Sequence, residues 1–138
     1  MSQAHDNPDR SSAPPPPRPT GAELEILRAL WDRGPSTVRE VHDHLSADRA
    51  VGYSTVLKLL QIMLGKGLVT RNERFRSHVY KASSPAERTQ RQLVDHLLDA
   101  AFGGSASQLV MRALSDRPTS SEELEEIRRL LDDIEGER

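Results

Sequence analysis

Four polar side chains lie at the spacing of one helical face near the middle of the chain, at Ser54, Thr55, Lys58 and Gln61. Positions i, i+1, i+4 and i+7 share one side of a helix. The opposite side is apolar and can anchor the helix in a core, with Val56, Leu59, Leu60 and Met63. Lysine can hydrogen-bond guanine O6 and N7 or a phosphate, glutamine suits adenine, and a serine or threonine at a helix N-terminus lies where phosphate binds well. The pattern indicates a helix that reads base edges in the major groove, although a single lysine or glutamine on a helix is ordinarily only solvated.

A basic stretch follows this candidate helix. From Ser54 to Lys81 the chain carries six basic residues and one acidic residue, Glu73, although the whole chain has a net charge of -2. A local excess of this kind is typical either of a solvated face or of a polyanion site. Arg71, Arg74 and Arg76 belong to it. Arg74 and Arg76 at the predicted hairpin tip can contact phosphates or enter the minor groove. Phe75 between them is better interpreted as a residue that packs at the base of the wing than as an exposed contact.

Other chemistries find little support in the sequence. The chain has no cysteine, which excludes disulfides, thiolate metal sites and a cysteine nucleophile. His42 and His44 are two residues apart on a predicted helix, so they point about 200° apart and cannot chelate one ion together. No nucleophile, base and orienting group can be assembled from the motifs present. We therefore expect no enzyme, no cofactor and no bound metal.

The hydrophobic periodicity predicts the elements that must position these side chains. Capping-box sequences begin helices at Thr20 and Thr37, and a third helix begins at Ser54 or Thr55 and runs to Lys66, with Gly67 as its left-handed C-cap. The period then changes from 3.6 to 2, which predicts strands over 68–71 and 78–81. The expected fold is mainly α with a small β-hairpin, a winged helix-turn-helix followed by a C-terminal helical dimerisation region.

The last third of the sequence is purely helical and acidic, with seven basic and twelve acidic residues from 84 to 138. Three short helices with apolar stripes can hardly form a self-sufficient core at this size. We therefore expect these stripes to meet a second copy of the chain. The predicted dimerisation residues are Leu97, Leu98, Phe102, Leu109, Val110, Leu114, Leu124, Ile127, Leu131 and Ile134.

The chain thus divides into a proline-rich, disordered tail over 1–19, a winged-helix domain over 20–83 and a helical dimerisation region over 84–138. No stretch approaches the ~20 consecutive apolar residues of a membrane-spanning helix, and the N-terminus has no apolar signal region. We expect a cytoplasmic protein without membrane insertion.

Several motifs, in their order and spacing, resemble the penicillinase-repressor (BlaI/MecI/CopY) family over about residues 20–135. The motifs are Glu23-Leu24-Glu25-Ile26-Leu27 with Leu30-Trp31, Gly34-Pro35-Ser36-Thr37-Val38-Arg39-Glu40-Val41, Tyr53-Ser54-Thr55-Val56, Lys66-Gly67-Leu68-Val69 and Phe102-Gly103-Gly104-Ser105. The resemblance implies a homodimeric winged-helix repressor that binds a palindromic operator in double-stranded DNA through its third helix and pairs through its C-terminal helices. A winged helix that only docks another protein is the alternative from a different class.

Two departures limit what the resemblance carries over. It implies a membrane-bound metallopeptidase sensor as a partner, which leads to cleavage of an Asn-Phe bond after the glycine-rich bend. Here Arg112-Ala113 occupies that place and no Asn-Phe pair exists. The paired cysteines of the copper-responsive members are absent as well. The operator, the target genes and the inducing signal are not encoded in any motif.

Overall fold

The computed structural model describes residues 17–74 and 76–137. Most of the predicted tail, residues 1–16, lies outside the described residues, as does Phe75. The chain forms two compact units, and the division between them falls between Gln92 and Leu93. Each unit is described by itself below.

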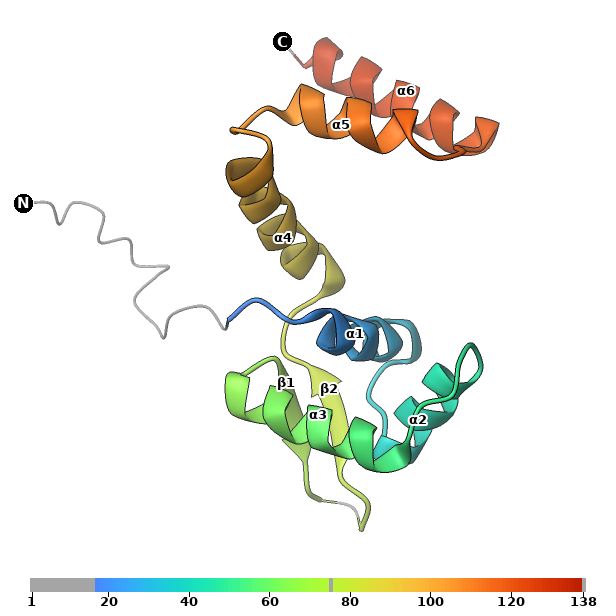
Figure 1. Ribbon diagram of the computed structural model, residues 1–138, viewed down its shortest axis with the longest axis vertical. Coiled ribbons are helices and arrows are strands. Elements are labelled where there is room, and N and C mark those ends of the chain that lie inside the picture. The colour runs from blue at the N-terminus through green and yellow to red at the C-terminus, as the bar shows by residue number, and fades with distance from the viewer. Residues whose placement is uncertain (1–16, 75, 138) are drawn as a thin grey trace, which may run out of the picture. The chain divides into compact units, whose positions relative to one another are not determined.

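The first unit begins with two helices whose starts are fixed by capping boxes. Helix α1 spans Gly21–Arg33 and α2 spans Val38–Ser46 (Figure 1). The hydroxyl oxygens of Thr20 and Thr37 each accept a hydrogen bond from the backbone N–H three residues on, at 3.2 Å, and a glutamate at that position accepts from the threonine N–H at 2.9 Å. Both predicted capping boxes are confirmed. They could be predicted because the geometry of a capping box depends only on the local sequence.

Helix α3 spans Tyr53–Lys66, so it begins slightly earlier than predicted. Its N-cap is Gly52, which offers no side chain to the first turn. The helix ends as predicted, at Gly67 in the left-handed conformation with φ 82° and ψ 13°. A residue with a Cβ is strained at that φ, so glycine ends the helix here and lets the chain turn into the hairpin.

Strands β1 (Val69–Asn72) and β2 (Val79–Ala82) pair antiparallel, with Val69 opposite Ala82. Each strand lies one residue later than predicted. Leu68 still belongs to the helix end, because its N–H donates to the Met63 carbonyl at 2.9 Å. An isolated bridge between Ser36 and Tyr80 ties the turn after α1 to β2, through mutual backbone bonds of 2.9 and 2.8 Å. The three helices and this hairpin form a winged helix-turn-helix, as predicted.

One apolar core holds the first unit together, built from one face of each helix and from the inner face of the hairpin. Ile26, Val41, Val56, Leu60 and Met63 are fully buried in it. Tyr80 of β2 is 1% exposed and is among the largest side chains inside. Trp31 packs against the edge of this core and donates its indole N–H to the Ser84 carbonyl at 2.9 Å. All elements of the first unit therefore share one hydrophobic cluster, which fixes α3 against α1 and α2.

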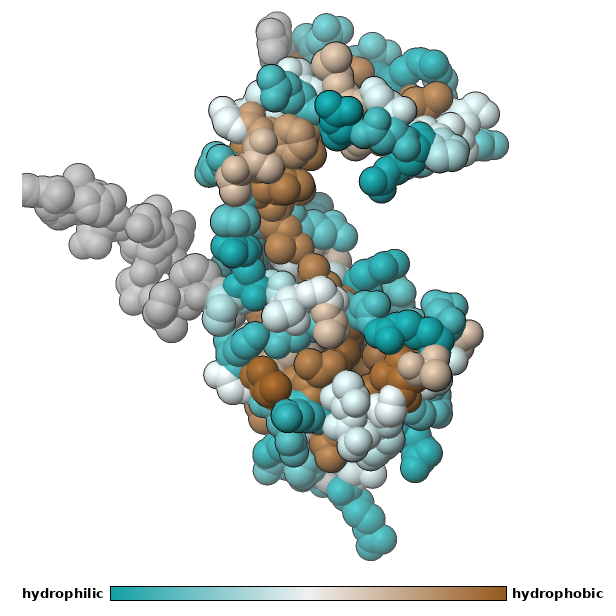
Figure 2. Space-filling model, viewed as in Figure 1, coloured by the Kyte–Doolittle hydropathy of each residue, from teal (hydrophilic) through white to brown (hydrophobic). Residues whose placement is uncertain are grey.

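Three further helices, α4 (Ala86–Ala101), α5 (Ala106–Ser115) and α6 (Ser121–Gly136), complete the chain (Figure 1). The hydroxyls of Ser105 and Ser120 accept hydrogen bonds from the N–H groups of Gln108 and Glu123, and so cap α5 and α6. No residue from 93 to 137 is fully buried, and hydrophobic side chains lie on the surface along α4 (Figure 2). No helix within the described part of the chain is long and apolar enough to cross a membrane.

Candidate nucleic-acid interface

The two faces of α3 differ sharply in exposure. Val56, Leu60 and Met63 are 0% exposed and anchor the helix in the core. The predicted reading residues Ser54, Thr55, Lys58 and Gln61 are all exposed to solvent. A helix fixed on one face with free polar side chains on the other has the form required for insertion into the major groove.

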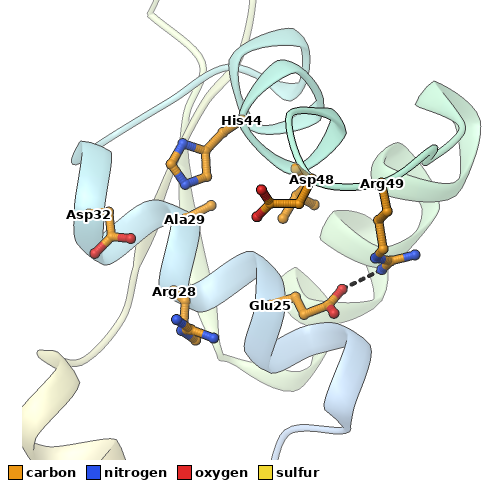
Figure 3. A pocket seen from close by; sticks show the side chains of 8 residues that line it. Glu25, Arg28, Ala29, Asp32, His44, Asp48 and Arg49 are labelled. Atoms are coloured by element: carbon orange, nitrogen blue, oxygen red, sulfur yellow. Dashed lines mark hydrogen bonds and ion pairs between the residues drawn. The ribbon is translucent and has the colours of Figure 1, made fainter. Parts of the chain in front are cut away.

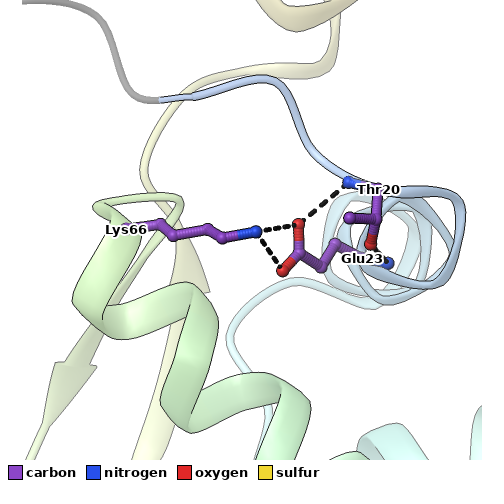
Figure 4. Close-up of polar contacts among 3 residues, drawn as sticks. All are labelled: Thr20, Glu23 and Lys66. Carbon is purple, nitrogen blue, oxygen red and sulfur yellow. Dashed lines mark hydrogen bonds and ion pairs between the residues drawn. The ribbon is translucent and has the colours of Figure 1, made fainter.

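The C-terminal end of α3 is fastened to the start of α1 by a half-buried ion pair (Figure 4). Lys66 Nζ lies 3.0 and 2.8 Å from the two carboxylate oxygens of Glu23, and that side chain is only 2% exposed. Burial raises the pKa of Glu23, but hydrogen bonds from Lys66 and the Thr20 N–H, with the Lys66 charge, outweigh it and lower the pKa. Sequence reasoning missed this pair, because its partners are 43 residues apart.

The wing, residues 69–82, presents Arg74 and Arg76 to solvent. The backbone N–H of Arg74 donates to Asn72 Oδ1 at 2.8 Å, which orders the start of the turn. Arg71 differs from these two arginines, because its guanidinium is hydrogen-bonded to Glu73. A hydrogen bond with Tyr80 and the pairing with Glu73 raise the pKa of Arg71, while the Arg71 hydrogen bond lowers the pKa of Glu73. Among the described residues of the wing, Arg74 and Arg76 are exposed and form no ion pair, whereas Arg71 is held against the hairpin.

The helix-turn-helix also carries a cluster that the sequence did not reveal. The guanidinium of Arg39 lies over the ring of Tyr53, 5.5 Å from its centroid. The same ring meets His42 edge to face at 5.8 Å. These contacts join the first two turns of α2 to the first residue of α3. No spacing rule for a single helix predicts them, because the partners lie on two different elements.

A cavity of about 260 Å³ lies between α1 and the end of α2 (Figure 3). Its lining includes the acids Glu25, Asp32 and Asp48 as well as Arg28, Arg49 and His44. The Arg49 guanidinium is bonded to the Glu25 carboxylate at one side. Because acidic groups are as numerous as basic ones here, this cavity does not suit a polyanion, unlike α3 and the wing. Among residues 17–74 and 76–137, no cluster of His, Asp or Glu has the arrangement of a metal site.

Every predicted dimerisation residue is exposed or only half buried. Leu97, Val110, Leu131 and Ile134 are among the exposed large hydrophobics of the chain, at 44–56% exposure. The others, Leu98, Phe102, Leu109, Leu114, Leu124 and Ile127, are intermediate in exposure. Apolar side chains of this number without a covering layer are unusual on a small protein.

An anchored helix with a polar reading face beside a basic hairpin defines the class of winged-helix DNA-binding proteins. The family model described as penicillinase repressor matches residues 19–133. The chain belongs to the penicillinase repressor family, as the sequence motifs predicted. It is accordingly a DNA-binding transcriptional repressor and not an enzyme.

Two relatives agree with this assignment by sequence. The chain is 32% identical over 116 residues to the transcriptional regulator BlaI of Mycobacterium tuberculosis, covering 83% of each chain. It is 20% identical over 113 residues to the penicillinase repressor of Staphylococcus aureus, covering 82% of this chain and 90% of that one. The solution structure of the DNA-binding domain of the repressor BlaI aligns with 54% of this chain and 90% of its own length, at 23% identity and a TM-score of 0.48.

Proposed function

We propose that the chain represses transcription by binding a palindromic operator as a homodimer, with α3 of each copy in a major groove. Ser54, Thr55, Lys58 and Gln61 read base edges or the adjoining phosphates, and Arg74 and Arg76 bind phosphates from the wing. Arg71 adds a third phosphate contact where its pairing with Glu73 is broken. The observation that carries the proposal is the two-faced α3, which buries Val56, Leu60 and Met63 completely and Leu59 partly, while its polar side is exposed. In this arrangement the two reading helices enter successive major grooves, roughly 34 to 36 Å apart.

We further propose that residues 84–138 pair the two copies and residues 20–83 bind the DNA. The absence of any fully buried residue from 93 to 137 supports this division, because a second copy would cover the exposed stripes. A dimer also matches the two-fold symmetry of a palindromic site. A protein that binds operator DNA works where the DNA lies, so the proposal includes a cytoplasmic location.

Release by cleavage at an Asn-Phe bond is not part of the proposal. Arg112 and Ala113 lie at the corresponding place, within α5, and Arg112 pairs with Asp116 at 3.4 Å. A sensor that acts on this chain would have to recognise a different bond or a different surface.

The test is a binding titration of the full chain on the DNA upstream of its own gene, against a duplex of scrambled sequence. We expect salt-sensitive binding with a clear preference for the upstream DNA. Lys58→Ala should weaken binding to the preferred DNA by about 1 to 3 kcal/mol and relax the preference at one base pair, if Lys58 reads a base edge. Unchanged discrimination would remove Lys58 from the reading face. The rival docking module predicts no salt-sensitive binding to either duplex.

Arg74→Ala provides the matched comparison in the wing. Because a phosphate contact carries no sequence information, this variant should weaken both duplexes alike and lower the dependence of affinity on salt. A variant that lost affinity only for the preferred DNA would instead assign Arg74 to base reading.

A further inference from the structure

Arg39 occupies a position that the stability of the fold does not explain. It lies in the first turn of α2, where the helix dipole disfavours a positive charge. Arg33 and Arg49 are paired with Glu40 and Glu25, whereas Arg39 forms no ion pair within the described part of the chain. Its contact with the ring of Tyr53, at 5.5 Å, is worth only about 0.5 to 1 kcal/mol at an exposed site.

The Tyr53 ring that contacts Arg39 packs against His42, and His42 is fixed to the turn between α2 and α3. His42 Nε2 lies 2.7 Å from the Val51 carbonyl, and it must carry the proton there because a carbonyl only accepts. The same imidazole meets the Tyr53 ring edge to face, at an interplanar angle of 65°. Tyr53 is nevertheless 42% exposed, so an aromatic face bearing a cation is held open to solvent.

The placement of this pair matches the path of a DNA backbone. Tyr53 is the first residue of α3 and directly precedes Ser54 on the reading face. When a recognition helix enters the major groove, the preceding helix crosses the sugar-phosphate backbone. A guanidinium stacked on an aromatic ring still presents its N–H donors at the edge, in the fork that fits two phosphate oxygens.

We propose that Arg39, positioned by Tyr53, binds a backbone phosphate at the edge of the major groove that α3 enters. This inference rests on the proposed DNA-binding function and adds a contact on α2 that neither the reading face nor the wing contains. His42 acts through Tyr53 as a second positioning residue.

The test compares Arg39→Gln with Arg33→Gln, a matched loss of one exposed arginine from the neighbouring helix. Affinity of the full chain is measured on the upstream DNA and on the scrambled duplex between about 50 and 200 mM salt. Each phosphate contact accounts for about 0.9 in the slope of log affinity against log salt, or about eightfold in affinity at 0.1 M salt. Arg39→Gln should therefore weaken a dimer about sixtyfold on both duplexes and flatten the slope, whereas Arg33→Gln should leave the slope unchanged.

Three further variants separate a positioning role from a loss of structure. Tyr53→Phe keeps the ring and should bind like the unchanged protein. Tyr53→Leu removes the ring and should weaken binding, but it should add little to Arg39→Gln in the double variant, because its effect passes through Arg39. Arg39→Lys keeps the positive charge but lacks the two-pronged guanidinium, so its affinity should lie between those of the unchanged protein and Arg39→Gln. This variant tests the phosphate contact even if Arg39→Gln folds poorly.

The outcomes are distinct from those that test the proposed function. An unchanged salt slope in Arg39→Gln, while Lys58→Ala and Arg74→Ala lose affinity, overturns the phosphate contact and leaves the repressor proposal standing. Equal losses in Tyr53→Phe and Tyr53→Leu overturn the positioning role, because the hydroxyl would then be the contact. Absence of duplex binding by the unchanged chain overturns both proposals together.

Discussion

At the scale of single residues, Glu23 is notable as a buried acidic side chain that takes part in two separate sets of contacts. Its carboxylate is almost wholly buried, yet it is ionised against Lys66 and also completes the capping box of α1. One residue therefore serves two elements. It starts α1 and fixes the end of the helix proposed to read DNA. Because the pKa of Glu23 is lowered in the folded chain, the ionised form contributes stability.

Glu23→Gln isolates the charge, since the amide oxygen can still accept from the Thr20 N–H. Breaking a fully buried pair costs about 3 to 5 kcal/mol, but Lys66 is 30% exposed and regains water, so we expect a loss of about 1 to 3 kcal/mol at neutral pH. The contribution is present above the ordinary pKa of 4.5 and is lost as pH falls through the lowered value. Urea unfolding of both proteins should therefore show a difference that shrinks below about pH 4.5.

Glu40→Gln is the control for this comparison. Glu40 occupies the same place in the capping box of α2, but its partner Arg33 lies 3.8 Å away and both side chains are well exposed. Loss of such a surface pair should change the free energy of unfolding by less than about 0.5 kcal/mol. If Glu40→Gln lowered the free energy of unfolding as much as Glu23→Gln, the cause of both losses would be a disturbed capping box. The loss of the Glu23–Lys66 ion pair would then not be the cause.

At the scale of elements, local sequence motifs predicted the helices and strands well, but they did not predict the contacts between elements. The capping boxes at Thr20 and Thr37 and the C-cap at Gly67 depend on four or five neighbouring residues, so the sequence contains all the information they need. The start of α3 shifted because Gly52 caps it without a side chain. The Arg39–Tyr53 contact depends on how two helices pack, and no single-helix pattern encodes that packing.

The wing is the element where prediction and structure differ most in chemical detail. Three arginines were predicted to bind DNA, but Arg71 lies opposite Tyr80 in the hairpin and is held by Glu73. We expect Glu73→Gln to strengthen binding to every duplex severalfold and to steepen the salt dependence, because it removes an acid from the wing and frees a guanidinium. Fluorescence anisotropy over a salt series measures both effects. Weaker binding by this variant would mean that Glu73 holds Arg71 in the orientation that DNA requires.

At the scale of the whole molecule, the chain divides its apolar surface unequally. The first unit encloses a core with buried side chains from α1, α2, α3 and both strands, whereas no residue from 93 to 137 is buried. The exposed stripe of α6 includes Leu131 and Ile134, at 56% and 46% exposure. Covering such a stripe with an identical stripe removes apolar area from water on both copies, at roughly 25 cal/mol for each Å². In the proposed dimer, the second copy completes a hydrophobic layer that one chain lacks.

Leu131→Glu tests this pairing, because a carboxylate placed in an apolar interface loses its hydration without gaining a partner. In sedimentation equilibrium the unchanged chain should have about twice its chain mass of 15.4 kDa, and Leu131→Glu should shift toward the single-chain mass. Arg129→Ala, on the opposite face of α6, should remain a dimer. Since the second half-site is bound intramolecularly only in a dimer, Leu131→Glu should also bind the full upstream DNA no better than a half-site. A variant that became monomeric yet kept full affinity would place dimerisation outside the mechanism of DNA binding.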